Sequence, residues 1–558
     1  MAEEKVIGRT SATEREANTS EKFFFWLAPG IIVNPFDIVE AIHSKGKNNN
    51  PSHTYGLITN IEHRTDAINH LSNFISSNFG DVAEEPNTPR QGASIAHVNV
   101  LSNDADIYMP LDNERPVRFA TKEGIEKALG IDSLMKERPK DAIPAGLIKL
   151  SSGAVATACI DRRYVVGPES AHINITGISG LATKTSYAMF ILQSILQTSE
   201  DPNKIAVIIL NVKHGDLLQI DELGPSLPPE QKEPWEAMGL KPEPFKHVHY
   251  LLPRSHKSGV PNSFITPPIH LIYAYDFLNT ADKLDFLFAQ IPDTYATLES
   301  IISEIKECVK SNDKEFENIK SWDNLLNLPP LFDPKTKASV KEWRNIRGSS
   351  IGVFRRHMRR IIYARNSGIF VKGSLATNER VLSEEMRKIK GGNVYVIDIA
   401  KLQDEEQALV FGDVLRTIYE IKAEGAEDEK GNPIESPEKI IFFVDELNKY
   451  APPGKGASSI TEQVLDIAGR GRSLGVVLVS AQQFMSQVNN QVTGNCATKV
   501  IGRSGSSELA ASEYRFLDDE LKMNVTRLIK GELLLSHAIY RQPVKIIFPM
   551  PAYKQPEK

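Results

Sequence analysis

The chain has 558 residues, of which 41% are hydrophobic and 24% are charged, and its formal net charge is −6. This length can bury at least one large core and predicts two or three globular domains. The acidic balance excludes a protein coated in basic charge, although it is compatible with a local basic channel. Cys159, Cys308 and Cys496 are too sparse for a disulfide framework or a zinc site. They favour a reducing compartment, so we expect a cytoplasmic protein.

The first part of the chain predicts a small β-barrel. Residues 1–20 are polar, which predicts a disordered N-terminus. From residue 21 to residue 160, short apolar or alternating runs such as KFFFWLAPGIIV and TYGLITNIEH are broken by Pro, Gly, Asn and Asp. Their spacing is typical of a barrel domain over 21–160. No apolar run reaches the roughly 18 residues of a membrane-spanning helix, so we expect no membrane association.

The pattern changes after the barrel. HINITGIS, KIAVIILNVK, NVYVIDIAKL, KIIFFVDELNKY and GVVLVSAQQ are apolar strands followed by helical patterns. This alternation predicts an α/β fold with a parallel sheet covered by helices on both faces. We assign the first part of this core to 161–280, a helical insertion to 281–367, the second part to 368–548 and a C-terminal tail to 549–558.

The stretch NITGISGLATKTSYA, residues 174–188, resembles a phosphate-binding loop with an altered spacing. The usual pattern is G-x-x-x-x-G-K-[ST], whereas here Thr183 stands where a glycine normally precedes the lysine. Lys184 would reach the β- and γ-phosphates, and the hydroxyl of Thr185 or Ser186 would hold Mg²⁺. A tight turn with a chance Lys-Thr pair is an equal alternative for this loop alone. The candidate nucleotide contacts are Gly177, Gly180, Thr183, Lys184, Thr185 and Ser186.

Two later strands end in polar side chains that suit phosphate chemistry. KIIFFVDELNK ends in Asp445 and Glu446, which could support Mg²⁺ and orient the attacking water. GVVLVSAQQ ends in Gln482, whose amide could bind a γ-phosphate. Between them, AGRGRSLGV carries Arg470 and Arg472, which could neutralise transition-state charge in the same subunit or from a neighbour. The alternative for Asp445 is an aspartate that only caps the segment after the strand. The alternative for Arg470 and Arg472 is a solvated helix end.

These pieces, in this order, resemble the HerA branch of the HerA–FtsK superfamily. The resemblance also includes NCATKVIGR and covers most of the chain from about residue 21 to the C-terminal strand. It is specific in the Asp-Glu strand FFVDELNK and in the G-R-x-x-G turn and Gln strand of GRGRSLGVVLVSAQQ, and it is loose elsewhere. It implies a RecA-like P-loop ATPase that assembles as a hexameric ring on double-stranded DNA, with ATP and Mg²⁺ as cofactors. It further implies that Lys184 and Thr185 bind ATP and Mg²⁺, that Asp445 supports the metal and that Glu446 is the catalytic base. Gln482 would be the γ-phosphate sensor, and Arg472 an arginine at the subunit interface.

The sequence departs from that family in three places. The loop lacks the usual G-S-G-K-S, Asn211 and Lys213 stand where the family often has an acid, and Ala171 replaces an arginine. Arg162 and Arg163, slightly upstream, are candidates to replace that arginine. Because the acidic pair and Gln482 are retained, we interpret the loop as altered but functional. The side chain at position 183 predicts weak or partner-dependent ATP binding, since the backbone there must approach phosphate closely.

A basic helical stretch is the best candidate for DNA contact. Arg355, Arg356, Arg359 and Arg360 lie at i, i+1, i+4 and i+5, on one broad helical face. Such a face could line a ring pore and contact phosphates without reading sequence. A solvated or salt-bridged face is nearly as good an interpretation of these four arginines.

The loop also resembles those of HerA proteins encoded beside nuclease or NAD-hydrolysing (sirtuin-like) effectors in antiphage systems. This resemblance implies an effector from an adjacent gene that docks on the β-barrel domain. We therefore hypothesise an ATP-driven DNA translocase or helicase that works with such an effector in antiviral defence. The alternative is a non-hydrolysing, nucleotide-binding scaffold ring that only organises effector subunits. The chain shows no nuclease constellation of its own.

Overall fold

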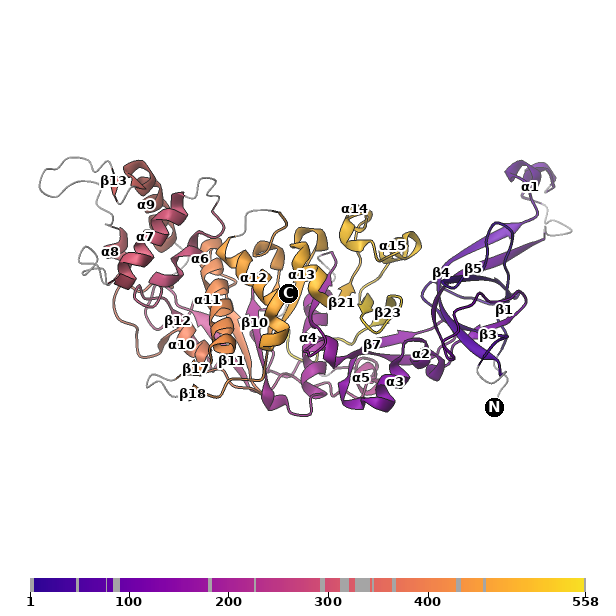
Figure 1. The fold of residues 1–558 in the computed structure, drawn as a ribbon, viewed down its shortest axis with the longest axis horizontal. Helices are drawn as coiled ribbons and strands as arrows, with labels where there is room; N and C mark the ends of the chain where they lie inside the picture. Colours follow the sequence, from indigo (N-terminus) through magenta and orange to yellow (C-terminus); the bar gives the residue numbers. More distant parts are fainter. Residues whose placement is uncertain are drawn as a thin grey trace, which may run out of the picture. The chain divides into compact units, whose positions relative to one another are not determined.

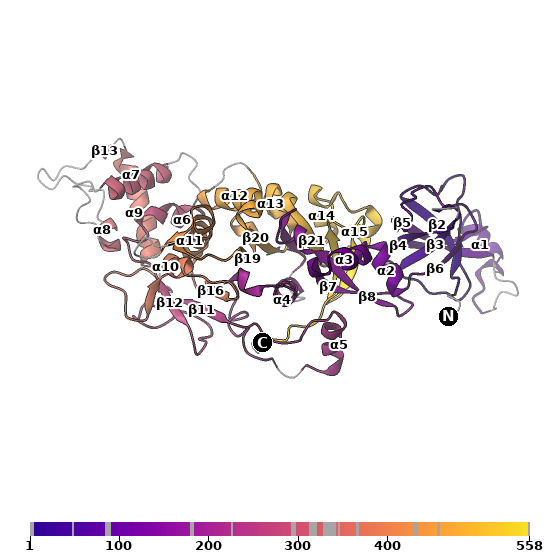
Figure 2. The same ribbon diagram turned by 60° about the horizontal axis from the view of Figure 1, so that its bottom comes forward.

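The chain forms two compact units, which Figures 1 and 2 draw as ribbons. The barrel unit comprises Met1–Asp161 and Val500–Pro549, and the sheet unit comprises Arg162–Lys499 and Met550–Lys558. The computed structural model describes residues 5–46, 50–76, 78–83, 91–178, 183–224, 227–291, 297–311, 321–326, 342–343, 346–363, 368–427, 433–454 and 458–555.

The barrel unit begins with a closed β-barrel of strand order β1-β2-β5-β4-β3-β6. Its strands are β1 (Gly8–Thr10), β2 (Lys22–Leu27), β3 (Ile38–His43), β4 (Ser52–Thr65), β5 (Gly92–Asn103) and β6 (Pro116–Phe119). Alternation decides which side chains fill it: Phe23 and Phe25 of β2 are fully buried, whereas their neighbours are partly exposed. β1 closes the barrel by pairing with both β2 and β6. The prediction of disorder over 1–20 is therefore wrong for β1, because barrel closure satisfies its backbone.

The remainder of the barrel unit combines segments that are far apart in the chain. It contains α1 (His70–Ser76), α2 (Lys122–Ala128), α3 (Ile131–Glu137), β7 (Ala142–Lys149), β8 (Val155–Asp161), α14 (Ser506–Leu509), α15 (Asp519–Val525), β22 (Glu532–His537) and β23 (Val544–Ile547). β7 pairs with β8 and also with β23, which in turn pairs with β22. Two predicted boundaries differ from this arrangement. The barrel strands end at Phe119 rather than near residue 160, and Val500–Pro549 belong with the barrel unit rather than with the predicted 368–548 core.

The sheet unit is built on parallel strands in the order β15-β12-β11-β16-β10-β19-β20-β9. These strands are β9 (Ala171–Thr176), β10 (Ile205–Asn211), β11 (Val248–Pro253), β12 (Leu271–Ala274), β15 (Glu379–Val381), β16 (Val394–Asp398), β19 (Lys439–Asp445) and β20 (Val476–Gln482). All residues of β9, β10, β16 and β20 are buried. Continuous apolar sequences suit such strands because helices cover both faces of the sheet.

Helices cover the two faces of this sheet, and in Figure 2 α11 and α12 lie on one face and α4 on the other. The helices and the remaining strands of the unit are α4 (Thr183–Gln197), α5 (Pro229–Ala237), α6 (Leu284–Phe288), α7 (Thr297–Ser311), α8 (Trp322–Leu326), α9 (Gly348–Ile362), α10 (Leu382–Arg387), α11 (Asp404–Ala423), α12 (Ser459–Leu474), α13 (Asn490–Asn495), β13 (Glu342–Trp343), β14 (Ile346–Arg347), β17 (Ala426–Glu427) and β18 (Pro433–Ile434). β21 (Cys496–Ile501) spans the chain boundary between the units. The barrel and this helix-covered parallel sheet confirm the predicted fold class.

The predicted helical insertion over 281–367 contains α6, α7, α8 and α9. Its apolar side chains, including Trp322 and Phe354, join one core cluster with Phe442 and Val444 of β19. The insertion is therefore packed as part of the sheet unit. The predicted tail over 549–558 also packs, since Tyr553 is buried and forms a bridge with Leu223. Within the described residues, none of the helices combines the length and apolarity needed to cross a membrane.

Candidate functional site

Four neighbouring strands of the sheet unit deliver polar side chains to one edge. β10, β19, β20 and β9 lie side by side and parallel, so their carboxyl ends share that edge. The residues at or just beyond these ends are Gly177, Lys213, Asp445, Glu446 and Gln482. Ligands of open parallel sheets bind outside the carboxyl ends of the strands. The edge therefore gathers four predicted site residues, Gly177, Asp445, Glu446 and Gln482, together with Lys213.

Lys184 lies in the first turn of α4, directly after the loop that leaves β9. Its ammonium Nζ donates a hydrogen bond to the carbonyl oxygen of Gly177 at 2.7 Å, and the residue is buried. Gly177 has a φ of 146°, in the region that favours glycine, and its N–H donates to the carbonyl of Gln483 at 3.3 Å. Burial lowers the pKa of Lys184, while the nearby Asp445 opposes this shift. The lysine is thus placed between the loop backbone and the acidic strand.

Thr185 and Asp445 meet across the sequence gap between α4 and β19. The hydroxyl Oγ1 of Thr185 donates to Oδ2 of Asp445 at 3.3 Å, and Asp445 is buried. The next residue, Glu446, has a left-handed backbone with φ 60° and ψ 47°, which costs a non-glycine residue on the order of 1 kcal/mol. Its N–H donates to the carbonyl of Ala481 in β20 at 2.6 Å. Strain of this kind persists where the surrounding structure holds a functional residue in place.

Lys213 joins this group from the end of β10. Its Nζ lies 3.2 Å from Oδ2 of Asp445 and 2.8 Å from Oε1 of Glu446. Burial disfavours the charged ammonium, but Asp445 and Glu446 outweigh that effect and raise the pKa of Lys213. The sequence singled out Lys213 only as a departure from a family pattern. Its position two residues beyond a buried parallel strand was the signal that could have placed it in the site.

Gln482 is fully buried at the end of β20. Among the described residues, neither the amide nitrogen nor the amide oxygen of Gln482 has a hydrogen-bond partner. The same holds for the hydroxyl of Thr176, which is opposite Gln482 in the β9–β20 register. Leaving a buried polar group unsatisfied costs about 1–3 kcal/mol. Unpaired polar atoms at this strand end are suited to bind a polar ligand.

Some predicted loop residues lie outside what the structure describes. Gly180 is outside the described residues, and Thr183 is described only as the first residue of α4. Ser186 lies in the first turn of α4 and is partly exposed. These three residues remain predictions.

The predicted arginines lie elsewhere in the same unit. Arg470 and Arg472 are in the last turns of α12, which ends at Leu474 just before β20 begins. They are therefore at the amino end of β20, about 20 Å along the strand from Gln482 by the usual rise per residue. Arg472 donates to the carbonyl of Glu169 at 2.7 Å, and Arg470 pairs with Asp466 at 3.1 Å. The structure does not bring either arginine to the loop of its own subunit.

Arg162 and Arg163, the candidates to replace the arginine missing at position 171, lie upstream of β9. Arg162 donates to Oγ1 of Thr198 at 2.8 Å and to the carbonyl of Ile195, so it binds the C-terminal end of α4. Arg163 lies 3.8 Å from Glu169, which precedes the amino end of β9. Both arginines therefore lie at the sheet edge opposite to the candidate site.

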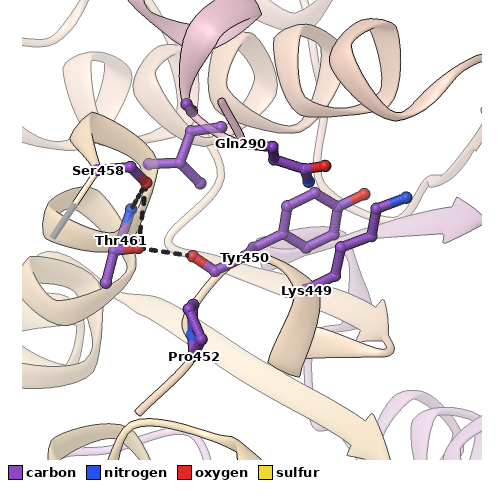
Figure 3. A pocket seen from close by; sticks show the side chains of 8 residues that line it. Gln290, Lys449, Tyr450, Pro452, Ser458 and Thr461 are labelled. Atoms are coloured by element: carbon purple, nitrogen blue, oxygen red, sulfur yellow. Dashed lines mark hydrogen bonds between the residues drawn. The ribbon is translucent and has the colours of Figure 1, made fainter. Parts of the chain in front are cut away.

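Residues that come shortly after the acidic pair in the sequence help to line a small cavity (Figure 3). Its volume is about 320 Å³, and it is lined by Ala289, Gln290, Lys449, Tyr450, Pro452, Ser458, Ile460 and Thr461. The hydroxyl of Thr461 donates to the carbonyl of Tyr450 at 3.0 Å, and Ser458 caps α12 by accepting from the N–H of Thr461. Lys449 is paired with Asp404. These contacts connect the segment after Glu446 to the start of α12, the helix that carries Arg470 and Arg472.

The oxygens at the site suit Mg²⁺. This ion prefers oxygen ligands and usually keeps several waters while bridging a carboxylate or hydroxyl and substrate phosphates. Thr185 and Asp445 present such oxygens to one point. In the part of the chain that the structure describes, no group of three or more His, Cys, Asp and Glu side chains could hold a metal ion. The donor set therefore fits an ion shared with phosphates rather than a cage made by the protein alone.

The predicted basic face forms on α9. This helix buries Ile351, Phe354, Met358, Ile361 and Ile362 on one side. Arg356, Arg359 and Arg360 are exposed, and Arg355 is half-buried. Arg360 forms an ion pair with Glu405 of α11. At least two arginines, Arg356 and Arg359, therefore present their charge to solvent.

A buried parallel strand that is followed by a helix with Lys184 and Thr185 in its first turn, beside an acidic strand end, is typical of a RecA-like P-loop fold. No family model matches the sequence. The DNA double-strand break repair helicase HerA of Pyrococcus furiosus is 25% identical over 202 residues, which cover 31% of this chain and 35% of that protein. The chain thus aligns with about a third of this relative, and the match confirms the predicted resemblance to HerA.

The chain is also similar to two solved structures. The bacterial conjugative coupling protein TrwBdeltaN70 is 12% identical, with a TM-score of 0.47 over 77% of this chain and 93% of TrwB. VirB4 of Thermoanaerobacter pseudethanolicus is 13% identical, with a TM-score of 0.41 over 75% of this chain and 97% of VirB4.

Proposed function

We propose that the chain is an ATPase that binds ATP and Mg²⁺ at the edge formed by β9, β10, β19 and β20 and uses hydrolysis to move along double-stranded DNA. The observation that carries this proposal is the meeting of Thr185 with Asp445, beside Glu446 and the buried Lys184. The HerA relative is named as a DNA double-strand break repair helicase, which supports the assignment of DNA as the partner.

Each residue of the site has a distinct task in this proposal. Lys184 exchanges its bond to the Gly177 carbonyl for the β- and γ-phosphates, and Thr185 and Asp445 orient the metal. Mg²⁺ supplies charge neutralisation on the phosphates. Glu446, at the strained turn, positions the attacking water, and the unpaired amide of Gln482 binds the γ-phosphate. Phosphoryl transfer depends mainly on such positioning and charge stabilisation.

The basic face of α9 is the proposed DNA contact. Arg356 and Arg359 are exposed on a helix whose opposite side is buried in the core of the sheet unit. A helix fixed in this way can present cations to the DNA backbone without base-specific contacts. Binding through phosphates is independent of sequence and weakens steeply as salt increases.

A steady-state ATPase assay with and without duplex DNA tests the proposed function. We expect duplex DNA to raise turnover several-fold, and the double variant Arg356→Ala/Arg359→Ala to lose most of this stimulation while keeping its basal rate. The matched control is Lys136→Ala/Lys246→Ala, which removes two cations that are about 70% exposed elsewhere on the surface. Nucleotide binding without hydrolysis under either condition would favour the scaffold alternative. Hydrolysis that DNA does not change would contradict translocation.

We further propose that the chain acts as a ring, in the form of a hexamer, in which Arg472 completes the site of a neighbouring subunit. Arg472 is too far from its own loop to act there, yet it lies on α12, whose start is bonded to the segment after Glu446. An arginine supplied from a neighbour stabilises transition-state charge in many phosphoryl-transfer enzymes. Arg470, two residues before Arg472 and paired with Asp466, is the second candidate for this role.

Mixing two inactive variants tests the shared site. Lys184→Ala and Arg472→Ala should each be inactive, and a mixture should partly recover activity because some boundaries combine an intact Lys184 with an intact Arg472. Sedimentation of each variant controls for assembly, since an interface arginine can also hold subunits together. A mixture as inactive as either parent would show that Arg472 does not act across the boundary. A fully active monomer at micromolar concentration would refute the ring.

The sequence resemblance leads us to propose a cytoplasmic antiphage role with an effector, a nuclease or NAD-hydrolysing enzyme, that docks on the barrel. The β4–β5 connection supports a docking role, because Ile68, Leu71, Phe74, Phe79 and Val82 are all strongly exposed there. Exposed apolar clusters of this kind mark interaction sites. Leu71→Ser/Phe74→Ser should abolish co-purification of the product of the adjacent gene while leaving ATPase activity unchanged. Undiminished co-purification would show that the effector docks at another surface.

A further inference from the structure

Lys213 occupies the centre of the acidic edge. Its ammonium lies within 3.2 Å of carboxylate oxygens from both Asp445 and Glu446, and Asp445 simultaneously accepts from Thr185. The backbone that carries Lys213 is held in place, because Asn211 donates to the carbonyl of His214 at 2.8 Å and to Oδ1 of Asp398 at 2.8 Å. The ion pairs therefore follow from the local fold at the end of β10.

The position of this ammonium conflicts with the proposed metal position. Oδ2 of Asp445 is the same oxygen that contacts Thr185 and Lys213. A divalent cation oriented by Thr185 and Asp445 would meet the ammonium at close range, and like charges repel strongly at such distances. The ammonium therefore opposes the binding of a metal ion at this carboxylate oxygen.

The ion pairs of Lys213 with Asp445 and Glu446 can also be broken at little cost in stability. The side chains of Lys213 and Glu446 are 41% and 39% exposed, and half-exposed ion pairs contribute little net stability. Lys213 has a long, flexible stem, so its ammonium can move into solvent without disturbing β10. Asp445, by contrast, is only 4% exposed and stays in place.

We propose that Lys213 is a positioning residue that gates metal loading: its ammonium neutralises Asp445 and Glu446 before Mg²⁺ arrives and must leave them for the metal to bind. This inference rests on the proposed ATPase function and deepens it. The proposal also explains why a lysine lies beside the acidic pair. Lys213 holds the two carboxylates together and lowers their affinity for metal in the absence of nucleotide.

Metal binding without turnover tests the gate. Mn²⁺ binding to the full chain is measured by electron paramagnetic resonance, with and without a non-hydrolysable ATP analogue. Without the analogue, Lys213→Gln should bind Mn²⁺ on the order of tenfold more tightly than the wild type, because one nearby positive charge is removed. Lys213→Arg keeps the charge and should behave like the wild type, whereas Asp445→Asn should lose the gain when combined with Lys213→Gln. Equal Mn²⁺ affinities of the wild type and Lys213→Gln, including no binding by either, would overturn the proposal.

A second measurement needs no variant. Amine-reactive labelling of the wild-type chain, read by mass spectrometry at Lys213, should increase several-fold when millimolar Mn²⁺ is added, because the released ammonium enters solvent. Unchanged labelling would contradict release. Binding of a fluorescent ATP analogue in the presence of millimolar Mg²⁺ separates this inference from the proposed function. No analogue binding by the wild type would refute the ATPase, whereas normal analogue binding with equal Mn²⁺ affinities would refute the Lys213 gate alone.

Discussion

Lys184→Ala is expected to abolish measurable ATP hydrolysis. In the structure the ammonium of Lys184 is buried and bound to the Gly177 carbonyl at the start of the loop. It is the only sequence-predicted cation that the structure places on this loop, among the residues it describes. Without it, no charge from the loop would hold the β- and γ-phosphates. A coupled-enzyme assay at saturating ATP, with duplex DNA present, measures the loss.

Two controls show whether this loss is specific. Lys204→Ala, which removes an exposed lysine that pairs with Glu438 at 3.2 Å outside the site, should keep the wild-type activity and so exclude a general effect of losing a lysine. The melting temperature of Lys184→Ala should stay within a few degrees of the wild type, since burial already disfavours the charged lysine. Hydrolysis by Lys184→Ala at the wild-type rate would show that the site lies elsewhere.

Glu446→Gln is expected to reduce turnover by about 10²-fold or more, which corresponds to roughly 2.7 kcal/mol of transition-state stabilisation. The amide keeps the size of the side chain and its hydrogen-bonding capacity, but it cannot act as the base that positions water. ATP affinity should change by only a few-fold, because Lys184 and Thr185, the proposed phosphate and metal contacts, are unaltered. Single-turnover kinetics and titration with a fluorescent ATP analogue measure the two quantities separately.

Asp404→Asn provides a matched control for this variant. Asp404 is an exposed carboxylate that pairs with Lys449, three residues after Glu446, so the change removes a nearby charge without touching the strand end. Its turnover should match that of the wild type. If Glu446→Gln lost nucleotide affinity as strongly as turnover, Glu446 would be a structural residue of the strained turn rather than the base.

Much of the core of the site could be predicted from the amino-acid sequence alone. KIIFFVD and VVLVSAQ are continuous apolar runs, and a fully buried strand is the structure that such runs favour when helices alternate with them. Once the strands are parallel, their carboxyl ends share one edge, so Asp445 and Gln482 had to lie near the loop before Lys184. The barrel followed in the same way from short alternating runs, as the burial of Phe23 and Phe25 shows.

Only the tertiary structure decided which distant segments meet. Lys213 reaches Asp445 because β10 pairs directly with β19, and strand order depends on pairings across hundreds of residues rather than on local pattern. The same long-range pairing of β23 with β7 places the C-terminal strands in the barrel unit. Arg472 looks close to Gln482 in sequence, yet β20 separates them along its whole length. Periodicity specifies what kind of element forms, whereas the ends of elements meet according to packing and hydrogen-bond pairing that no local stretch encodes.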